Sequence, residues 1–351
     1  MPDDRTLVTE LGTALGMLGA DTPAAALAAG PGPLVLEPAT WDRLVALHSD
    51  GGHADVLQHA FANGRAFLAS PDALRCRLPA LVEWTGGRRP PGDEVAPVDL
   101  RVDHVYLVSC KYLSRAIANV SPARIFDGLL ATTGSWDRSD WYEVVAPEEH
   151  RHFYQACRAA AGLHDLPDEP SAMDGVERRL LRAALPARRL PDEASTAAYR
   201  ALCDAVSTRS AQRWQDHLDD GAERQRLARR LLRIGNATYF LLGSDERGPL
   251  RLRVADAWDW HRHHRLLGLS IRASGAGQPQ VDWTIELAEP GGRRVDVHGH
   301  VEIRWSHGRF AQPPEAKVYV DTATGDLPGY VRLADAATGT GTGTDQLPLW
   351  P

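Results

Sequence analysis

The sequence predicts an α+β protein with an α/β core near the N-terminus, a helical middle region and a C-terminal antiparallel β domain. Two blocks of the chain carry apolar residues at three- and four-residue spacing, which is the pattern of amphipathic helices. A third block consists of short apolar runs separated by turn residues, which is the pattern of antiparallel strands. With 351 residues, of which 43% are hydrophobic, the chain is long enough for two or three packed units. The predicted units are 1–135, 136–235 and 236–333, followed by a flexible tail over 334–351.

Residues 1–80 read as helices, as in DRTLVTELGTALGML and in the run that begins at Trp41. The turn-rich segment GGRRPPGDEVAP then leads into VDLRV and HVYLVSCKY, two runs rich in β-branched and aromatic residues. These runs predict a β-hairpin with its turn at Asp103-His104. A helix is expected to follow from Ser114 to the segment ATTGSWD.

The middle region, 138–235, is predicted to be helical because its apolar residues again follow the helical period. Its last run, ERQRLARRLLRIG, places Gly235 where a helix C-cap is expected. The C-terminal region then offers six strand candidates separated by turns such as SDERG and EPGG. These candidates are TYFLLG, LRLRVA, RLLGLSIRA, QVDWTIELA, RVDVHGHVEIRW and AKVYVD.

Composition limits the classes of function. The net charge of −7 disfavours a free-standing, non-specific nucleic-acid binder, because such affinity comes largely from basic residues on phosphates. Four scattered cysteines without a CxxC pair are typical of reduced thiols in a cytoplasm. The start of the sequence lacks the basic and apolar regions of a signal peptide, and no stretch approaches the length of a membrane span. We therefore expect a cytoplasmic protein without a membrane partner.

The hairpin carries the most chemically informative residues of the core. Side chains two positions apart in a strand share a face, so Ser109 and Lys111 are expected to point the same way, and Asp99 in the preceding strand can lie beside them. An acid on one strand and a lysine on the next can hold a divalent cation and stabilise a pentacoordinate phosphate. The turn could begin one or two residues later, which would place Asp103 in the strand, so Asp103 is a second candidate acid.

This arrangement resembles the PD-(D/E)xK nuclease superfamily, in which an acid, a short loop and an apolar strand precede (E/D)xK and a helix. The matching residues are Pro97-Val98-Asp99, the run VYLV and Ser109-Cys110-Lys111. The resemblance implies a restriction-endonuclease-like core, a site for Mg²⁺ or Mn²⁺ at Asp99, and a catalytic Lys111. It also implies a glutamate from the helix before the hairpin, a role for which Glu83 is placed. The chain departs from the pattern at Ser109, where the family has an acidic residue. The alternative is an ordinary hairpin.

Basic residues in two other places could contact phosphate. The segment from 298 to 321 contains Arg304, His307, Arg309 and Lys317, and the helix ERQRLARRLLRIG contains Arg226 and Arg230. A solvated surface is the alternative in both places. Glu315-Ala316-Lys317 is a rival ExK motif, although it follows two prolines rather than an apolar strand.

A histidine group is a further candidate site. His261 and His263 would share the face of a strand and could ligate zinc, although no other ligand is spaced to complete that site.

The tail ends in QLPLWP after the low-complexity run ATGTGTGT. Exposed large apolar residues at the end of a linker are unfavourable unless a partner receives them. The residues Gln346, Leu347, Leu349 and Trp350 resemble the bacterial sliding-clamp binding motif. The resemblance implies docking on the β sliding clamp of bacterial DNA polymerase III, which would raise the effective concentration of an acidic protein near DNA.

Together these patterns predict a nucleoid-associated, metal-dependent DNA nuclease of repair, replication or phage defence. The alternative is a non-catalytic clamp-associated adaptor with a degenerate nuclease fold.

Overall fold

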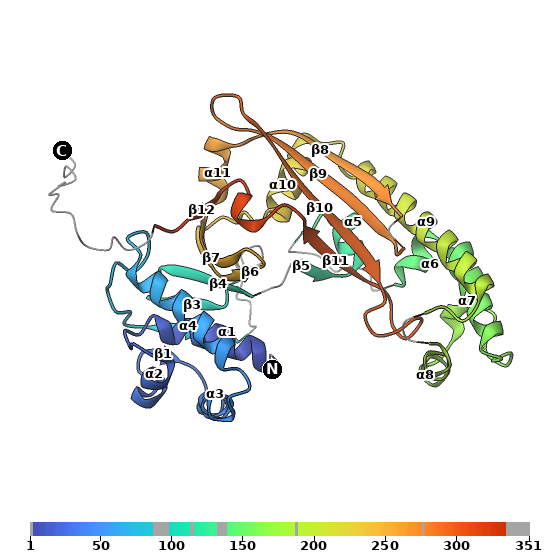
Figure 1. Cartoon of the computed structure of the whole chain (residues 1–351). Helices are drawn as coiled ribbons and strands as arrows, with labels where there is room; N and C mark the ends of the chain where they lie inside the picture. Colours follow the sequence, from blue (N-terminus) through green and yellow to red (C-terminus); the bar gives the residue numbers. More distant parts are fainter. Residues whose placement is uncertain are drawn as a thin grey trace.

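Two β-sheets organise the chain, as the computed structural model shows (Figure 1). The structure describes residues 3–86, 98–112, 116–131, 139–186, 189–275 and 277–334. Seven strands form one sheet in the order β1-β2-β3-β4-β6-β7-β12, and five form the other in the order β5-β11-β10-β9-β8. The coarse prediction of a mixed α+β protein with a C-terminal antiparallel sheet is confirmed.

Four helices build the N-terminal part: α1 (Asp4–Gly16), α2 (Pro23–Ala29), α3 (Pro38–Asp50) and α4 (Ala54–Ala69). Helices α1 and α4 cross at very short range because glycines lie at the crossing. A Cβ added to Gly16 would lie 2.1 Å from the Phe61 carbonyl oxygen, and one added to Gly64 would lie 2.0 Å from that of Thr13. Only glycine fits at such a backbone approach. The crossing therefore fixes the position of α1 above the sheet.

The seven-stranded sheet is mixed, and its strands come from both ends of the chain. They are β1 (Leu34–Val35), β2 (Val82–Trp84), β3 (Leu100–Val102), β4 (Tyr106–Tyr112), β6 (Tyr239–Asp245), β7 (Gly248–Val254) and β12 (Tyr330–Arg332). Strands β2, β3 and β4 form an antiparallel meander, and β4 pairs in parallel with β6. Val108 and Leu242 pack in one hydrophobic core with α1 and α4, whereas Leu241 and Leu252 pack in a second core on the opposite face.

The prediction of a helix that begins at Ser114 is wrong. Ser114 itself lies outside the described residues, but the chain from Ala116 to Val120 is a strand, β5, and only the short helix α5 (Pro122–Phe126) follows it. Strand β5 pairs with β11, so Ala118 lies opposite Val318. A helical period in five residues is weak, and pairing with a distant strand satisfies the same backbone groups.

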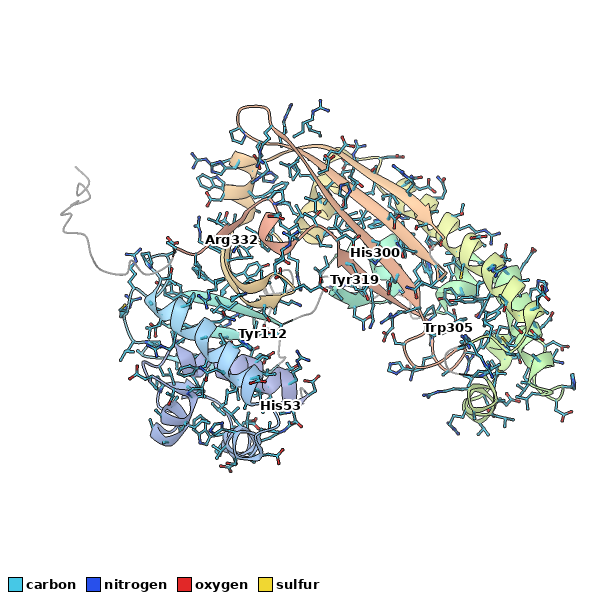
Figure 2. The ribbon with its side chains drawn as sticks, in the orientation of Figure 1. His53, Tyr112, His300, Trp305, Tyr319 and Arg332 are labelled. Atoms are coloured by element: carbon cyan, nitrogen blue, oxygen red, sulfur yellow. The ribbon has the colours of Figure 1, made fainter. Side chains whose placement is uncertain are left out.

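The five-stranded sheet is completed by β8 (Arg265–Ser274), β9 (Gln280–Ala288), β10 (Arg294–Arg304) and β11 (Glu315–Val320). All six predicted strand runs of the C-terminal region are strands, although the first two, β6 and β7, belong to the seven-stranded sheet. Alternate residues of β9 and β10, such as Trp283 and Val301, are buried. The residues between them form the polar face, on which His300 and Tyr319 stack at 4.7 Å (Figure 2).

Helices cover the apolar face of this sheet, and α9 runs along β8 and β9 (Figure 1). The helices of the middle and C-terminal regions are α6 (Trp141–Val145), α7 (Pro147–Ala160), α8 (Gly175–Ala184), α9 (Glu193–Asp216), α10 (Gly221–Leu231) and α11 (Ala257–His263), with short 3₁₀ turns η1 (Pro170–Ala172) and η2 (Thr324–Asp326). In the described ranges, no helix has the length and apolar character needed to cross a bilayer.

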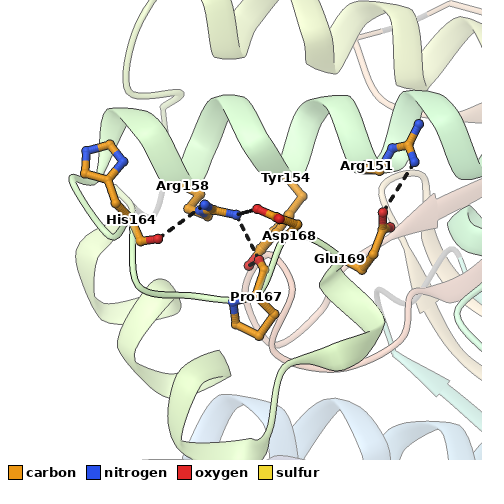
Figure 3. Close-up of polar contacts among 7 residues, drawn as sticks. All are labelled: Arg151, Tyr154, Arg158, His164, Pro167, Asp168 and Glu169. Carbon is orange, nitrogen blue, oxygen red and sulfur yellow. Dashed lines mark hydrogen bonds and ion pairs between the residues drawn. The ribbon is translucent and has the colours of Figure 1, made fainter.

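Helix α7 holds the loop that follows it (Figure 3). The Arg158 guanidinium donates to the Asp168 carboxylate at 2.7 Å and to the Pro167 carbonyl at 3.0 Å. The Tyr154 hydroxyl donates to the same carbonyl at 2.7 Å. These bonds stabilise an irregular connection that has no ladder of its own.

Candidate functional site

The predicted hairpin forms, and it brings Asp99 and Ser109 together. Asp99 immediately precedes β3, and its amide donates to the Val108 carbonyl at 2.9 Å. One oxygen of its carboxylate, Oδ2, accepts from the Cys110 amide at 2.6 Å and from the Ser109 hydroxyl at 3.4 Å. Ser109 is completely buried, so its hydroxyl orients the carboxylate rather than contacting solvent.

A second carboxylate, which the sequence alone did not single out, approaches Asp99 from α1. Glu10 is only 8% exposed, and its Oε2 accepts from the Trp84 indole N–H at 2.6 Å. Burial raises the pKa of Glu10 to about 7, and the negative charge of Asp99 adds to the rise, while the bond from Trp84 opposes it. Glu10 rather than Glu83 is thus the glutamate that a helix before the hairpin places beside Asp99.

The two carboxylates line a cavity of about 480 Å³ between α1, the end of β4 and the β5–β11 edge. Four basic side chains line the same cavity: Arg5, Lys111, Arg233 and Lys317. Lys111 follows Ser109 by two positions in β4. The cavity therefore combines an acidic pair with basic groups from α1, β4, β11 and the segment that follows α10.

Local packing fixes the end of β4 that carries Lys111. The hydroxyl of Tyr112 lies 2.9 Å from that of Thr13 and accepts from the Asn63 amide at 3.2 Å (Figure 2 shows Tyr112 at this position). On the other side, a Cβ added to Gly243 would lie 1.6 Å from the Lys111 carbonyl oxygen. The absence of a side chain at Gly243 therefore permits β6 to lie against β4 at this point.

The thiol beside Lys111 is unsuited to nucleophilic attack. Burial raises the pKa of Cys110 well above its usual value, and the charges of Asp99 and Glu10 raise it further. The reactive thiolate is therefore disfavoured.

Two predicted site residues, Asp103 and Glu83, do not line the cavity. Asp103 is in the turn at the opposite end of β3 from Asp99, and its Oδ1 accepts from the amides of Ala80 at 2.8 Å and Leu81 at 3.0 Å. Glu83 lies in strand β2 rather than in a helix, opposite Arg101, and its carboxylate is 3.4 Å from the His104 ring. Both side chains bond to groups of the turn region.

The basic residues predicted to bind DNA divide into two groups. Lys317 lines the cavity with Lys111. The four arginines have partners near by: Arg304 pairs with Glu302, Arg226 with Glu223, Arg309 donates to the carbonyls of Pro186 and Arg189, and Arg230 donates to that of Leu129. Burial also lowers the pKa of Arg230, in keeping with its position inside the fold.

The Glu315-Ala316-Lys317 motif and the histidine group, the two rival candidate sites, do not form metal sites in the described residues. Glu315 accepts from the Ser306 hydroxyl and from the Asn119 amide, and lies at the strand end that is paired with Arg304. His261 and His263 lie in the helix α11 rather than in a strand, because Asp256 caps that helix by accepting from Trp258 and Asp259. Across the ranges given above, no cluster of three or more His, Cys, Asp or Glu side chains is arranged to hold a metal ion.

The predicted clamp-binding residues Gln346, Leu347, Leu349 and Trp350 lie outside the described residues, as does Pro97. Comparison of the chain with known protein families, with curated proteins and with solved structures found no match. The site is therefore interpreted from its own chemistry.

Proposed function

We propose that this chain is a metal-dependent DNA nuclease whose centre is the cavity between α1 and the β3–β4 hairpin. One observation carries the proposal: the buried Glu10 and the half-buried Asp99, carboxylates from different parts of the fold, line one cavity that four basic side chains also line, and the charge of Asp99 raises the pKa of Glu10. Two like charges that interact in this way are unfavourable unless a proton or a cation lies between them. Basic groups around an acidic pair are what a cation and a phosphodiester require together.

The donor set fits Mg²⁺ or Mn²⁺. These ions are commonly held by one or two carboxylates together with waters and substrate phosphate oxygens, so a third protein ligand is not required. Glu10 and Asp99 would hold the ion. When bound, it would supply a Lewis acid and a water of lowered pKa.

The residues around the pair have supporting roles. The Cys110 amide and the Ser109 hydroxyl fix one oxygen of Asp99, and the Trp84 indole fixes Glu10. The ammonium group of Lys111 would stabilise the charge that develops on the phosphate oxygens as water attacks phosphorus and the bond to the sugar oxygen breaks. Arg5, Arg233 and Lys317 would bind phosphates on either side.

The test is incubation of the full-length protein with nicked, mismatched, flapped and single-stranded DNA in Mg²⁺, Mn²⁺ or EDTA. Cleavage is expected only with a divalent cation, and Lys111→Ala is expected to lose it. Equal behaviour of the wild type and Lys111→Ala on every substrate would exclude the catalytic proposal.

A second candidate is a clamp-associated adaptor that binds DNA without cutting it. The position of Ser109 favours it, since a hydroxyl stands where the PD-(D/E)xK nucleases, which the hairpin resembles in sequence, carry an acidic ligand. The adaptor predicts DNA and clamp binding with no metal-dependent cleavage in the same assay.

Recruitment by the tail is tested separately. Deletion of residues 345–351 is expected to abolish pull-down of the β sliding clamp and to leave the cleavage of short oligonucleotides unchanged. Retention of clamp binding by the deletion variant would contradict the tether.

A further inference from the structure

A second cavity opens beside the proposed centre and shares its wall. It has a volume of about 570 Å³, within the range of about 300–1,000 Å³ that is usual for small-molecule sites. Lys111, Ala116, Ile117 and Arg233 line both cavities, so the two adjoin along β4, β5 and the end of α10. A ligand held in one is therefore within reach of the other.

The two cavities differ in chemistry. The second has an apolar and aromatic wall formed by Leu231, Tyr239, Leu241, Leu250, Leu327 and Tyr330. Its two tyrosine hydroxyls have partners, since that of Tyr330 donates to the Leu232 carbonyl at 2.8 Å and lies 3.5 Å from that of Tyr239. The rings are thereby held in place as part of the wall.

Polar groups complete the second cavity. Lys111 and Arg233 supply positive charge on the shared wall, while Asp245 and Glu246 supply carboxylates. A further acid there, Asp321, is held by the His300 ring at 2.9 Å. An anionic group at the shared wall, a flat apolar body and amino groups that donate to carboxylates would together complement this lining. A nucleotide with an adenine, guanine or cytosine base has all three, whereas a simple anion lacks the second and an acyl chain lacks the third.

We infer that the second cavity receives one nucleotide whose base has left the helical stack, with its phosphate at Lys111 and Arg233. The inference rests on the proposed function and narrows its substrate to DNA with an unpaired nucleotide at the scissile position, such as a flap, a single-stranded end or an extrahelical base. A base inside a duplex cannot enter a walled cavity without being unstacked.

The test measures binding of deoxyadenosine 5′-monophosphate, deoxyadenosine and inorganic phosphate to the full-length protein in EDTA. The monophosphate is expected to bind at least tenfold more tightly than either fragment. Ala323→Trp fills a half-buried position on the cavity wall. It is expected to weaken the binding of the monophosphate at least tenfold and to leave the binding of inorganic phosphate unchanged. Thr324→Trp is a second filling variant, and Ala172→Trp, in an exposed 3₁₀ turn outside the cavity, is the matched control.

Two results would overturn the inference: a monophosphate that binds no more tightly than inorganic phosphate, or filling variants that fold as judged by circular dichroism and bind it as the wild type does. Binding in EDTA is independent of cleavage, so the two proposals fail separately. A protein that binds the monophosphate but cuts no DNA loses the nuclease proposal alone. One that cuts DNA through Lys111 but ignores the monophosphate loses the cavity inference alone.

Discussion

The two ends of the β3–β4 hairpin each carry an aspartate, and the surroundings of the two differ. Asp99 faces the buried carboxylate of Glu10 in a cavity lined with basic groups. Asp103 accepts from the backbone amides of Ala80 and Leu81 and has a positive φ of 50°, a conformation that aspartate tolerates better than most residues. The residue type is the same, but one aspartate lines the proposed metal site and the other stabilises a turn.

The largest expected effect is a difference in cleavage activity between substitutions of Asp99 and of Asp103. Asp99→Asn should lower metal-dependent cleavage at least 100-fold, because one of the two proposed carboxylate ligands is lost together with its negative charge. Asp103→Asn should keep cleavage within about threefold, since asparagine retains the acceptor oxygen and the tolerance of positive φ. Rates on a flapped substrate in Mg²⁺ measure both. Equal losses would remove the distinction between the hairpin ends.

The next effect is the pH dependence of stability. The folded protein holds a proton on Glu10 up to about pH 7, whereas the unfolded chain releases it near the usual value of 4.5. The folded state therefore binds more protons in this interval, and its stability falls as pH rises from about 4.5 to 7. Glu10→Gln should remove up to about 3 kcal/mol of that fall. Urea unfolding of both proteins at pH 5 and pH 8 gives the difference, in which the raised pKa of Asp140 cancels.

A smaller effect is expected from the cation itself. Mg²⁺ at ten times its dissociation constant should stabilise the wild type by about 1.4 kcal/mol. The gain should be greater at pH 8 than at pH 5, because Glu10 is ionised only at the higher pH. Thermal unfolding with and without Mg²⁺ measures it, with EDTA-containing buffer as the reference. An equal gain in Asp99→Asn would place the ion elsewhere.

The smallest effect belongs to the turn. Asp103→Ala should cost about 1 kcal/mol of unfolding free energy, because two amides lose their acceptor and alanine disfavours positive φ. A loss that depended on Mg²⁺ would assign Asp103 to the metal site after all.

The hairpin could be predicted from sequence because its information is local. Alternation in VYLVSCK, the turn-forming pair Asp103-His104 and the spacing of Ser109 and Lys111 lie within fifteen residues or so of one another. The strands of the C-terminal region could be predicted for the same reason.

The rest depends on contacts between distant segments. Glu10 reads as one polar position of an amphipathic helix, and only the α1–α4 crossing and the sheet beneath it bring its carboxylate to Asp99. Strand β5 resembles a helix in sequence and becomes a strand by pairing with β11. Helix α11 has only seven residues, so its helical spacing of apolar residues is a weaker signal than its aromatic residues, which favour a strand. Asp256 just before it is an N-cap signal that could have identified the helix.

The parallel pairing of β4 with β6 also has a consequence for synthesis. A ribosome makes Glu10, Asp99 and Lys111 early, whereas Arg233 and then β6 follow the whole helical middle region, and Lys317 comes later still. A nascent or prematurely terminated chain would carry the acidic pair without two of the four basic groups that we propose bind phosphate. We expect such incomplete products not to cleave DNA, so that the proposed nuclease activity requires synthesis beyond Lys317.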